Sequence, residues 1–215
     1  MGKPLFVLLL TGLLSSAAFA GQPLTNISTV VIDSGHADDG VGRKGDSSGK
    51  TRCALVALAL KDIIERENGT TVKTVLTLKA DSIPNQRERA FTANSNSASV
   101  YVSIHEYSAN QAVAGVFSPS PSSDDGPPTW KDAGAKYLQK SALLAEKVRA
   151  TFEAAFPGQK YFVGYAPLAT FYGVSAPAVA IEAVPRDPKA PWAPEQPGIV
   201  ATVLYTALLE YGRFP

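Results

Sequence analysis

Short β-branched apolar runs alternate with longer apolar stretches along this chain. The short runs have the length and composition of buried strands, and the longer stretches have the length of helices. The predicted strands cover residues 29–33, 72–78, 99–105, 113–118, 161–172 and 176–182, and the predicted helices cover 50–67, 85–94, 133–156 and 198–211. Strands that alternate with helices predict an α/β fold: a mostly parallel twisted sheet in a single domain, flanked by helices on both faces.

Three side chains with acid–base or metal-binding chemistry stand where predicted strands end. His36 follows the run Thr-Val-Val-Ile-Asp-Ser-Gly, His105 ends Ser-Val-Tyr-Val-Ser-Ile-His, and Glu182 ends Ala-Pro-Ala-Val-Ala-Ile-Glu. Open α/β sheets carry their sites at the carboxyl ends of strands. A single histidine in such a position is most often buried and hydrogen-bonded. Both histidines of the chain lie at strand ends, which favours either a metal site or an acid–base site.

The first 20 residues have the pattern of a secretory signal peptide. Lys3 precedes an apolar run over 5–14, and Ala18-Phe19-Ala20 forms a small-x-small cleavage site. This pattern predicts a signal peptide over 1–20, a mature domain over 21–215, and a periplasmic or secreted location. No later run reaches about 18 apolar residues, so we expect no membrane span in the mature chain. With 215 residues and 45% hydrophobic content, the chain can bury one core.

Charge, cysteine content and one glycine-rich loop narrow the functional classes. The chain has 20 basic and 19 acidic residues, and loss of Lys3 with the signal peptide leaves 19 of each. Such a balance argues against nucleic acid as a partner. Cys53 is the single cysteine, which excludes an intrachain disulfide and favours a small buried apolar side chain. The loop over 45–51 has three residues between its glycines where a phosphate-binding loop has four, so we expect no nucleotide site.

The strand-end residues suit zinc chemistry. Neutral imidazoles are common zinc ligands, and a catalytic zinc takes three protein ligands and a water molecule. A carboxylate outside the coordination shell can take a proton from that water and return it to a leaving amine, a role that fits Glu182. Asp33, three residues before His36, is placed to orient that ligand.

The order and spelling of these motifs resemble a known family, the zinc-dependent N-acetylmuramoyl-L-alanine amidases of the type-3 family. These enzymes cleave the bond between the lactyl group of muramic acid and the peptide stem of peptidoglycan. The matching pieces, in chain order, are Val31-Ile32-Asp33-Ser34-Gly35-His36, Leu76-Thr77 with Asp81, Arg89 with Ala93-Asn94, Val102-Ser103-Ile104-His105, Gly115-Val116-Phe117, and Pro177-Ala178-Val179-Ala180-Ile181-Glu182. The resemblance covers about residues 29–214.

The resemblance implies that His36 and His105 bind zinc, that Glu182 is the general base, and that peptidoglycan or muropeptides are the substrate. It also implies an amidase-like catalytic domain, which we expect to be a monomer. The third ligand of the family is a glutamate in a Glu-Lys pair at the start of the first helix, where this chain has Gly49-Lys50. Asp46 is the best substitute; the other acidic residues near the histidines are Asp38, Asp39 and Glu106.

Two further departures bear on substrate preference. Leu78 stands where the family usually has an arginine, and Glu106-Tyr107 replaces small or polar residues after the second histidine. The alternative hypothesis is therefore a catalytically impaired relative that has kept the fold as a peptidoglycan-binding or regulatory module. Because His36, His105 and Glu182 are all present, the enzyme is the favoured hypothesis.

Overall fold

A six-stranded sheet forms the centre of the molecule. The computed structural model describes residues 22–35, 48–78, 84–107, 113–120, 129–185 and 193–214, and within these ranges it describes the side chains of all residues except 48–51, 106–107, 113–114 and 184–185. The strands are β1 (Thr29–Ser34), β2 (Lys73–Leu76), β3 (Val100–Tyr107), β4 (Val113–Pro119), β5 (Lys160–Ala166) and β6 (Ala178–Pro185). Their spatial order is β2-β1-β3-β6-β4-β5.

Two blocks of parallel strands make up this sheet. Strands β2, β1, β3 and β6 run in one direction, β4 and β5 run in the other, and the antiparallel junction lies between β6 and β4. The carboxyl ends of β1, β3 and β6 therefore lie at the same edge of the sheet, as the sequence predicted for the strands that precede His36 and contain His105 and Glu182.

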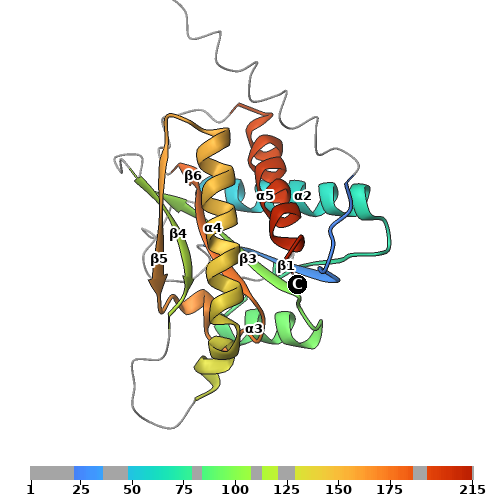
Figure 1. Cartoon of the computed structure of the whole chain (residues 1–215), viewed down its shortest axis with the longest axis vertical. Coiled ribbons are helices and arrows are strands. Elements are labelled where there is room, and N and C mark those ends of the chain that lie inside the picture. The colour runs from blue at the N-terminus through green and yellow to red at the C-terminus, as the bar shows by residue number, and fades with distance from the viewer. Residues whose placement is uncertain are drawn as a thin grey trace, which may run out of the picture.

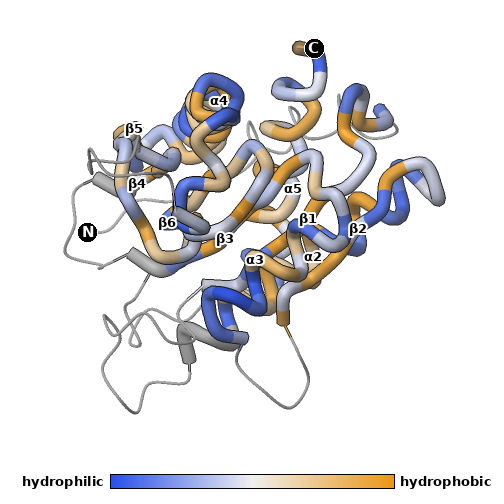
Figure 2. Tube along the Cα trace, turned by 90° about the horizontal axis from the view of Figure 1, so that it is seen from below, coloured by the Kyte–Doolittle hydropathy of each residue, from blue (hydrophilic) through white to orange (hydrophobic). Residues whose placement is uncertain are grey.

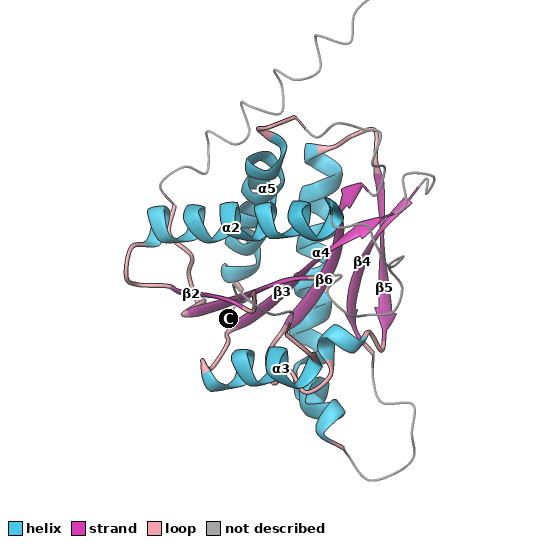
Figure 3. Cartoon of the chain, turned by 180° about the vertical axis from the view of Figure 1, so that it is seen from behind, coloured by secondary structure: helices cyan, strands magenta, loops and turns pink. Residues whose placement is uncertain are grey.

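Helices cover both faces of the sheet, which confirms the predicted α/β architecture. They are α2 (Ser48–Asn68), α3 (Gln86–Ser95), α4 (Leu138–Ala155) and α5 (Gln196–Gly212). Figure 1 shows α4 and α5 side by side in front of the sheet, and Figure 3 shows from behind how α2 crosses α5. Figure 2 shows α3 on the opposite side of the sheet from α4, with a largely hydrophilic sequence. No helix in the described ranges is both long and apolar enough to cross a membrane.

The core is asymmetric because the two faces carry different residues. The larger cluster lies between the sheet and α2, α4 and α5, and includes Ile32, Leu60, Leu204 and Phe152. The smaller cluster lies on the α3 face and consists mainly of alanine and aromatic residues, among them Tyr101 and Ala180. Asp33, His105 and Glu182 alternate with the large-cluster residues along β1, β3 and β6, so they belong to the α3 face.

Two predicted elements begin or end differently in the structure. The predicted helix over 133–156 starts as a 3-10 segment, η1 (Trp130–Tyr137), and becomes α-helical at Leu138. The strand predicted over 161–172 ends at Ala166 and is followed by the short η2 (Ala169–Phe171). Gly134 packs so tightly that an added Cβ would lie 3.2 Å from the carbonyl oxygen of Val174. No local sequence pattern predicts this contact between Gly134 and Val174.

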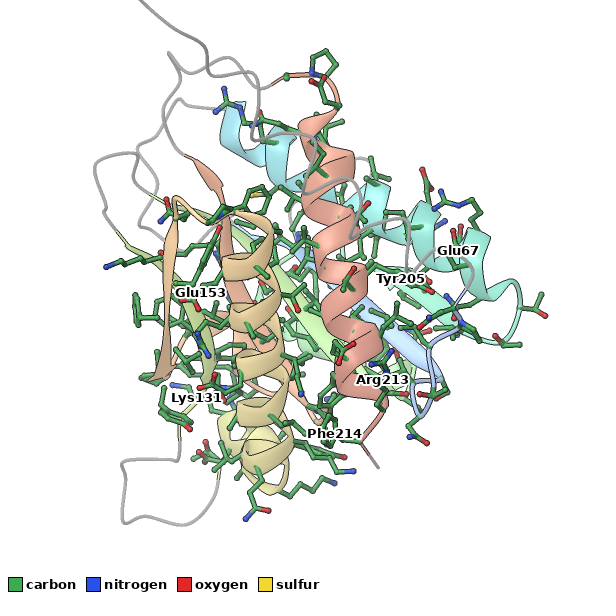
Figure 4. All side chains as sticks on the ribbon, turned by 45° about the horizontal axis from the view of Figure 1, so that its top comes forward. Glu67, Lys131, Glu153, Tyr205, Arg213 and Phe214 are labelled. Carbon is green, nitrogen blue, oxygen red and sulfur yellow. The ribbon has the colours of Figure 1, made fainter. Side chains whose placement is uncertain are left out.

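The segment before β1 is held by residues of α2 and α5. The Tyr205 hydroxyl donates to the carbonyl oxygen of Gln22 at 2.6 Å, and the Leu24 N–H donates to Asn68 Oδ1, also at 2.6 Å. Figure 4 shows Tyr205 reaching from α5 toward the end of α2, where Glu67 is labelled. These bonds fix the position from which β1 enters the sheet.

Candidate active site

The structure brings His105 and Glu182 together. They are register partners on the adjacent parallel strands β3 and β6, and the ladder is irregular just after His105. Paired residues of parallel strands direct their side chains to the same face, so the imidazole and the carboxylate stand beside each other. His36, the third predicted site residue, lies outside the described residues, as do Asp38, Asp39 and Asp46.

The end of β1 lies directly against the ring of His105. A Cβ added to Gly35 would lie 2.5 Å from both Cε1 and Nδ1 of that imidazole, a distance that no side chain tolerates. The Gly35 N–H also donates to the carbonyl oxygen of Ile104 at 2.7 Å. The glycine is therefore required by close approach. It brings the chain to the His105 ring one residue before His36.

A buried ionic network lies behind this edge of the sheet. Asp33 Oδ2 accepts hydrogen bonds from Arg89 Nη1 at 2.7 Å, Ser103 Oγ at 2.7 Å and Thr170 Oγ1 at 3.2 Å, and its Oδ1 accepts from Thr77. The side chains of Asp33 and Arg89 are 0% and 1% exposed. A carboxylate so deeply buried needs this many donors to offset the loss of its hydration.

Ser103 connects the network to the candidate site. Its hydroxyl lies 2.9 Å from His105 Nε2 and donates its proton to the Asp33 carboxylate, which can only accept. Ser103 Oγ is therefore the acceptor for a proton on Nε2, and the lone pair of the neutral ring lies on Nδ1. This is the tautomer that a metal ligand bound through Nδ1 requires.

Glu182 has the environment of a proton acceptor. Its Oε2 accepts a 2.7 Å hydrogen bond from the Gly115 N–H of β4. Partial burial raises the pKa of the Glu182 carboxyl, and the hydrogen bond from Gly115 lowers it by a smaller amount. A carboxylate with a raised pKa is a better base near neutral pH.

Several motif residues that the sequence left without a role belong to the buried network. Thr77, Arg89 and Ser103 come from three separate motifs and meet at Asp33.

Asn94 belongs to the same α3 motif as Arg89. It donates to the Gly173 carbonyl at 2.8 Å and accepts from the Ser175 N–H at 2.9 Å, and these bonds hold the segment that precedes β6. The prediction that Asp33 orients His36 is untested, because His36 lies outside the described residues; among the described residues, Asp33 contacts His105 through Ser103. Thr170 carried no sequence signal.

A protein-family model matches this arrangement of motifs. The model described as N-acetylmuramoyl-L-alanine amidase matches residues 30–187, which span β1 to β6. The chain belongs to this family. The predicted family and enzyme class, an amidase, are thereby confirmed.

Solved structures of amidases share the fold. The N-acetylmuramoyl-L-alanine amidase of Clostridium difficile 630 aligns with 20% identity and a TM-score of 0.66 over 87% of this chain and 97% of its own. The catalytic domain of CwlV from Bacillus (Paenibacillus) polymyxa gives 21% identity and a TM-score of 0.65, over 86% and 98%. AmiC2 of Nostoc punctiforme gives 24% and 0.63, over 87% and 98%. No curated protein matches the chain.

The described residues of this amidase include side chains that can bind a metal, but they do not include a complete set of ligands. Its described residues contain no group of three or more His, Cys, Asp or Glu side chains arranged for a metal ion. The first turn of α2 contains no acidic residue, and Gly49 has no side chain to offer as a ligand. The imidazole of His105, with its Nδ1 lone pair, fits the donor chemistry of zinc, and the Glu182 carboxylate stands beside it.

Proposed function

We propose that this protein hydrolyses the amide bond between N-acetylmuramic acid and the L-alanine of the peptidoglycan stem, with zinc held by His36 and His105. The observation that carries the proposal is the pairing of His105 with Glu182 on adjacent strands of an amidase-family sheet. An imidazole metal ligand and a carboxylate base must act on one water molecule, and their position as register partners supports this shared role.

The residues of this chain would divide the work as follows. His105 offers Nδ1 to the metal while Ser103 and Asp33 hold its Nε2 proton. Zinc, when bound, polarises the amide carbonyl and lowers the pKa of water. Glu182 takes the proton from the attacking water and delivers it to the leaving amine, and the Gly115 N–H keeps the carboxylate in position.

We further propose that residues 1–20 are a signal peptide and that the mature amidase domain, residues 21–215, acts as a monomer in the periplasm or outside the cell. Support comes from the apolar run and small-x-small site at the N-terminus and from the cell-wall substrate of the family. N-terminal sequencing of protein recovered from the periplasm and medium tests the cleavage after Ala20.

Zinc stoichiometry and product release together test the catalytic proposal. Purified mature protein should hold about one zinc per chain, and His36→Ala and His105→Ala should lose it. Glu182→Ala should retain zinc but release no stem peptide from muropeptides. Glu146→Ala, which removes a carboxylate that is 54% exposed on α4, is the matched control and should keep both properties. Loss of zinc from Glu182→Ala would show that Glu182 is a ligand and not the base.

A second function is favoured by one observation. The family's glutamate ligand is replaced by Gly49, and the first turn of α2 offers no other acidic residue. If Asp46 does not replace it, the protein would be a catalytically impaired module that binds peptidoglycan. Asp46→Ala separates the two functions: loss of zinc assigns Asp46 as the third ligand, and absence of zinc from the wild type, even after reconstitution, supports the module.

A further inference from the structure

Two phenylalanines and two glycines alternate on the strands next to Glu182. In the parallel pair of β4 and β5, Gly115 is the register partner of Phe162, and Phe117 is the partner of Gly164. Each aromatic ring thus has glycine as its cross-strand partner and also two residues away on its own strand. Register partners share a face, and these four residues lie on the face of the sheet that carries His105 and Glu182.

The phenylalanine rings occupy the space that the glycines leave open. A Cβ on Gly164 would lie 3.1 Å from Phe162 Cε2 and 3.3 Å from Phe117 Cδ1. The two rings meet edge to face, with centroids 5.4 Å apart and planes at 90°. The rings are therefore held in a defined orientation by each other and by the backbone of the sheet.

This aromatic pair reaches the candidate catalytic carboxylate. A Cβ on Gly115 would lie 2.3 Å from Phe117 Cε2 and 2.9 Å from Glu182 Oε2, so the ring and the carboxylate converge on one point of the sheet. Phe162 is 45% exposed. On the opposite face of the same strand Tyr161 is buried against Phe152 of α4. Figure 3 shows β4 and β5 at the edge of the sheet, to one side of α3.

We propose that Phe117 and Phe162 bind the glycan part of the substrate, by contact with the apolar C–H face of an N-acetylated sugar ring. This inference rests on the proposed amidase function and deepens it. Sugar C–H groups carry a small positive charge and are attracted to the negative face of an aromatic ring. The stem peptide carries carboxylates, which require cationic or hydrogen-bonding partners, and the two phenylalanine rings offer neither. A neutral sugar ring beside Glu182 would place the adjoining amide at the catalytic carboxylate.

Binding of a fragment that cannot be hydrolysed tests this inference separately from catalysis. The probe is the peptide-free disaccharide of N-acetylglucosamine and N-acetylmuramic acid, titrated into the mature protein while NMR follows the backbone amides of Gly115 and Gly164. Phe162→Ala and Phe162→Leu should weaken binding between about 2-fold and about 10-fold, the effect of losing one aromatic contact, and Phe162→Trp should preserve it. Phe91→Ala on α3, which removes an aromatic ring that is 73% exposed, is the matched control.

The outcomes separate the sugar site from other roles of the same residues. Unchanged disaccharide binding in Phe162→Ala, with an unchanged unfolding midpoint, would overturn the inference. So would weakened binding of the free stem peptide with disaccharide binding intact, because the aromatic pair would then be a peptide site. Failure of the wild type to release stem peptide, with disaccharide binding still dependent on Phe162, would overturn the hydrolase function and leave the sugar site standing.

Discussion

The Asp33–Arg89 pair gives the sharpest test of how this site is supported. Asp33→Asn keeps the shape of the side chain but removes the charge that faces Arg89. Both side chains are buried, at 0% and 1% exposure, so the guanidinium would lose a buried carboxylate partner. Breaking a buried ion pair on one side costs about 3–5 kcal/mol, a large share of the roughly 5–15 kcal/mol that stabilises a typical domain. Ser103, Thr77 and Thr170 would also lose their common charged acceptor.

Chemical denaturation measures this cost directly. Urea unfolding of wild type, Asp33→Asn, Arg89→Met and the double variant gives the four corners of a cycle. The double variant should cost less than the sum of the two single variants, because removal of both charges leaves neither one buried alone. A loss of less than about 1 kcal/mol in Asp33→Asn, or strict additivity in the cycle, would refute the argument that the pair is energetically coupled.

Three further predictions concern the residues that meet at the sheet edge. Burial raises the pKa of the Glu182 carboxyl in the folded state, so the stability that this group contributes is present below its unfolded pKa and is lost as the pH rises through its folded pKa. Glu182→Gln should therefore be more stable than wild type at neutral pH and equally stable in acid. Thermal unfolding measured across pH tests this. Gly115→Ala should cost about 1–3 kcal/mol and reduce stem-peptide release, since its Cβ would displace the Phe117 ring and the Glu182 carboxylate; unchanged stability and turnover would contradict the packing. Ser103→Ala should weaken zinc affinity about 10- to 100-fold and change the ¹⁵N shifts of the His105 ring, and an unchanged tautomer would show that Ser103 does not orient it.

Local sequence signals predicted most of the elements in this fold. The β-branched runs form β1, β3 and β6, and Asn85 begins α3 with a capping box completed by Glu88, as residues of those types do. These features depend on side-chain alternation and on hydrogen bonds that span three or four residues. The same local patterns predict where these strands end. If the strands are taken as parallel, those ends bring His105 and Glu182 to one edge of the sheet.

Long-range packing decided what the local pattern could not. Arg89 and Thr170 are 56 and 137 residues from Asp33, and no periodicity relates residues at such separations. No local pattern therefore indicated that Asp33 would contact His105 through Ser103. It likewise did not show that β4 and β5 run against the other strands and bring Phe162 onto the face that carries Glu182. The composition of a strand determines that its segment is extended and buried. Which strands become neighbours, and in which direction each runs, depends on how the whole chain packs its core.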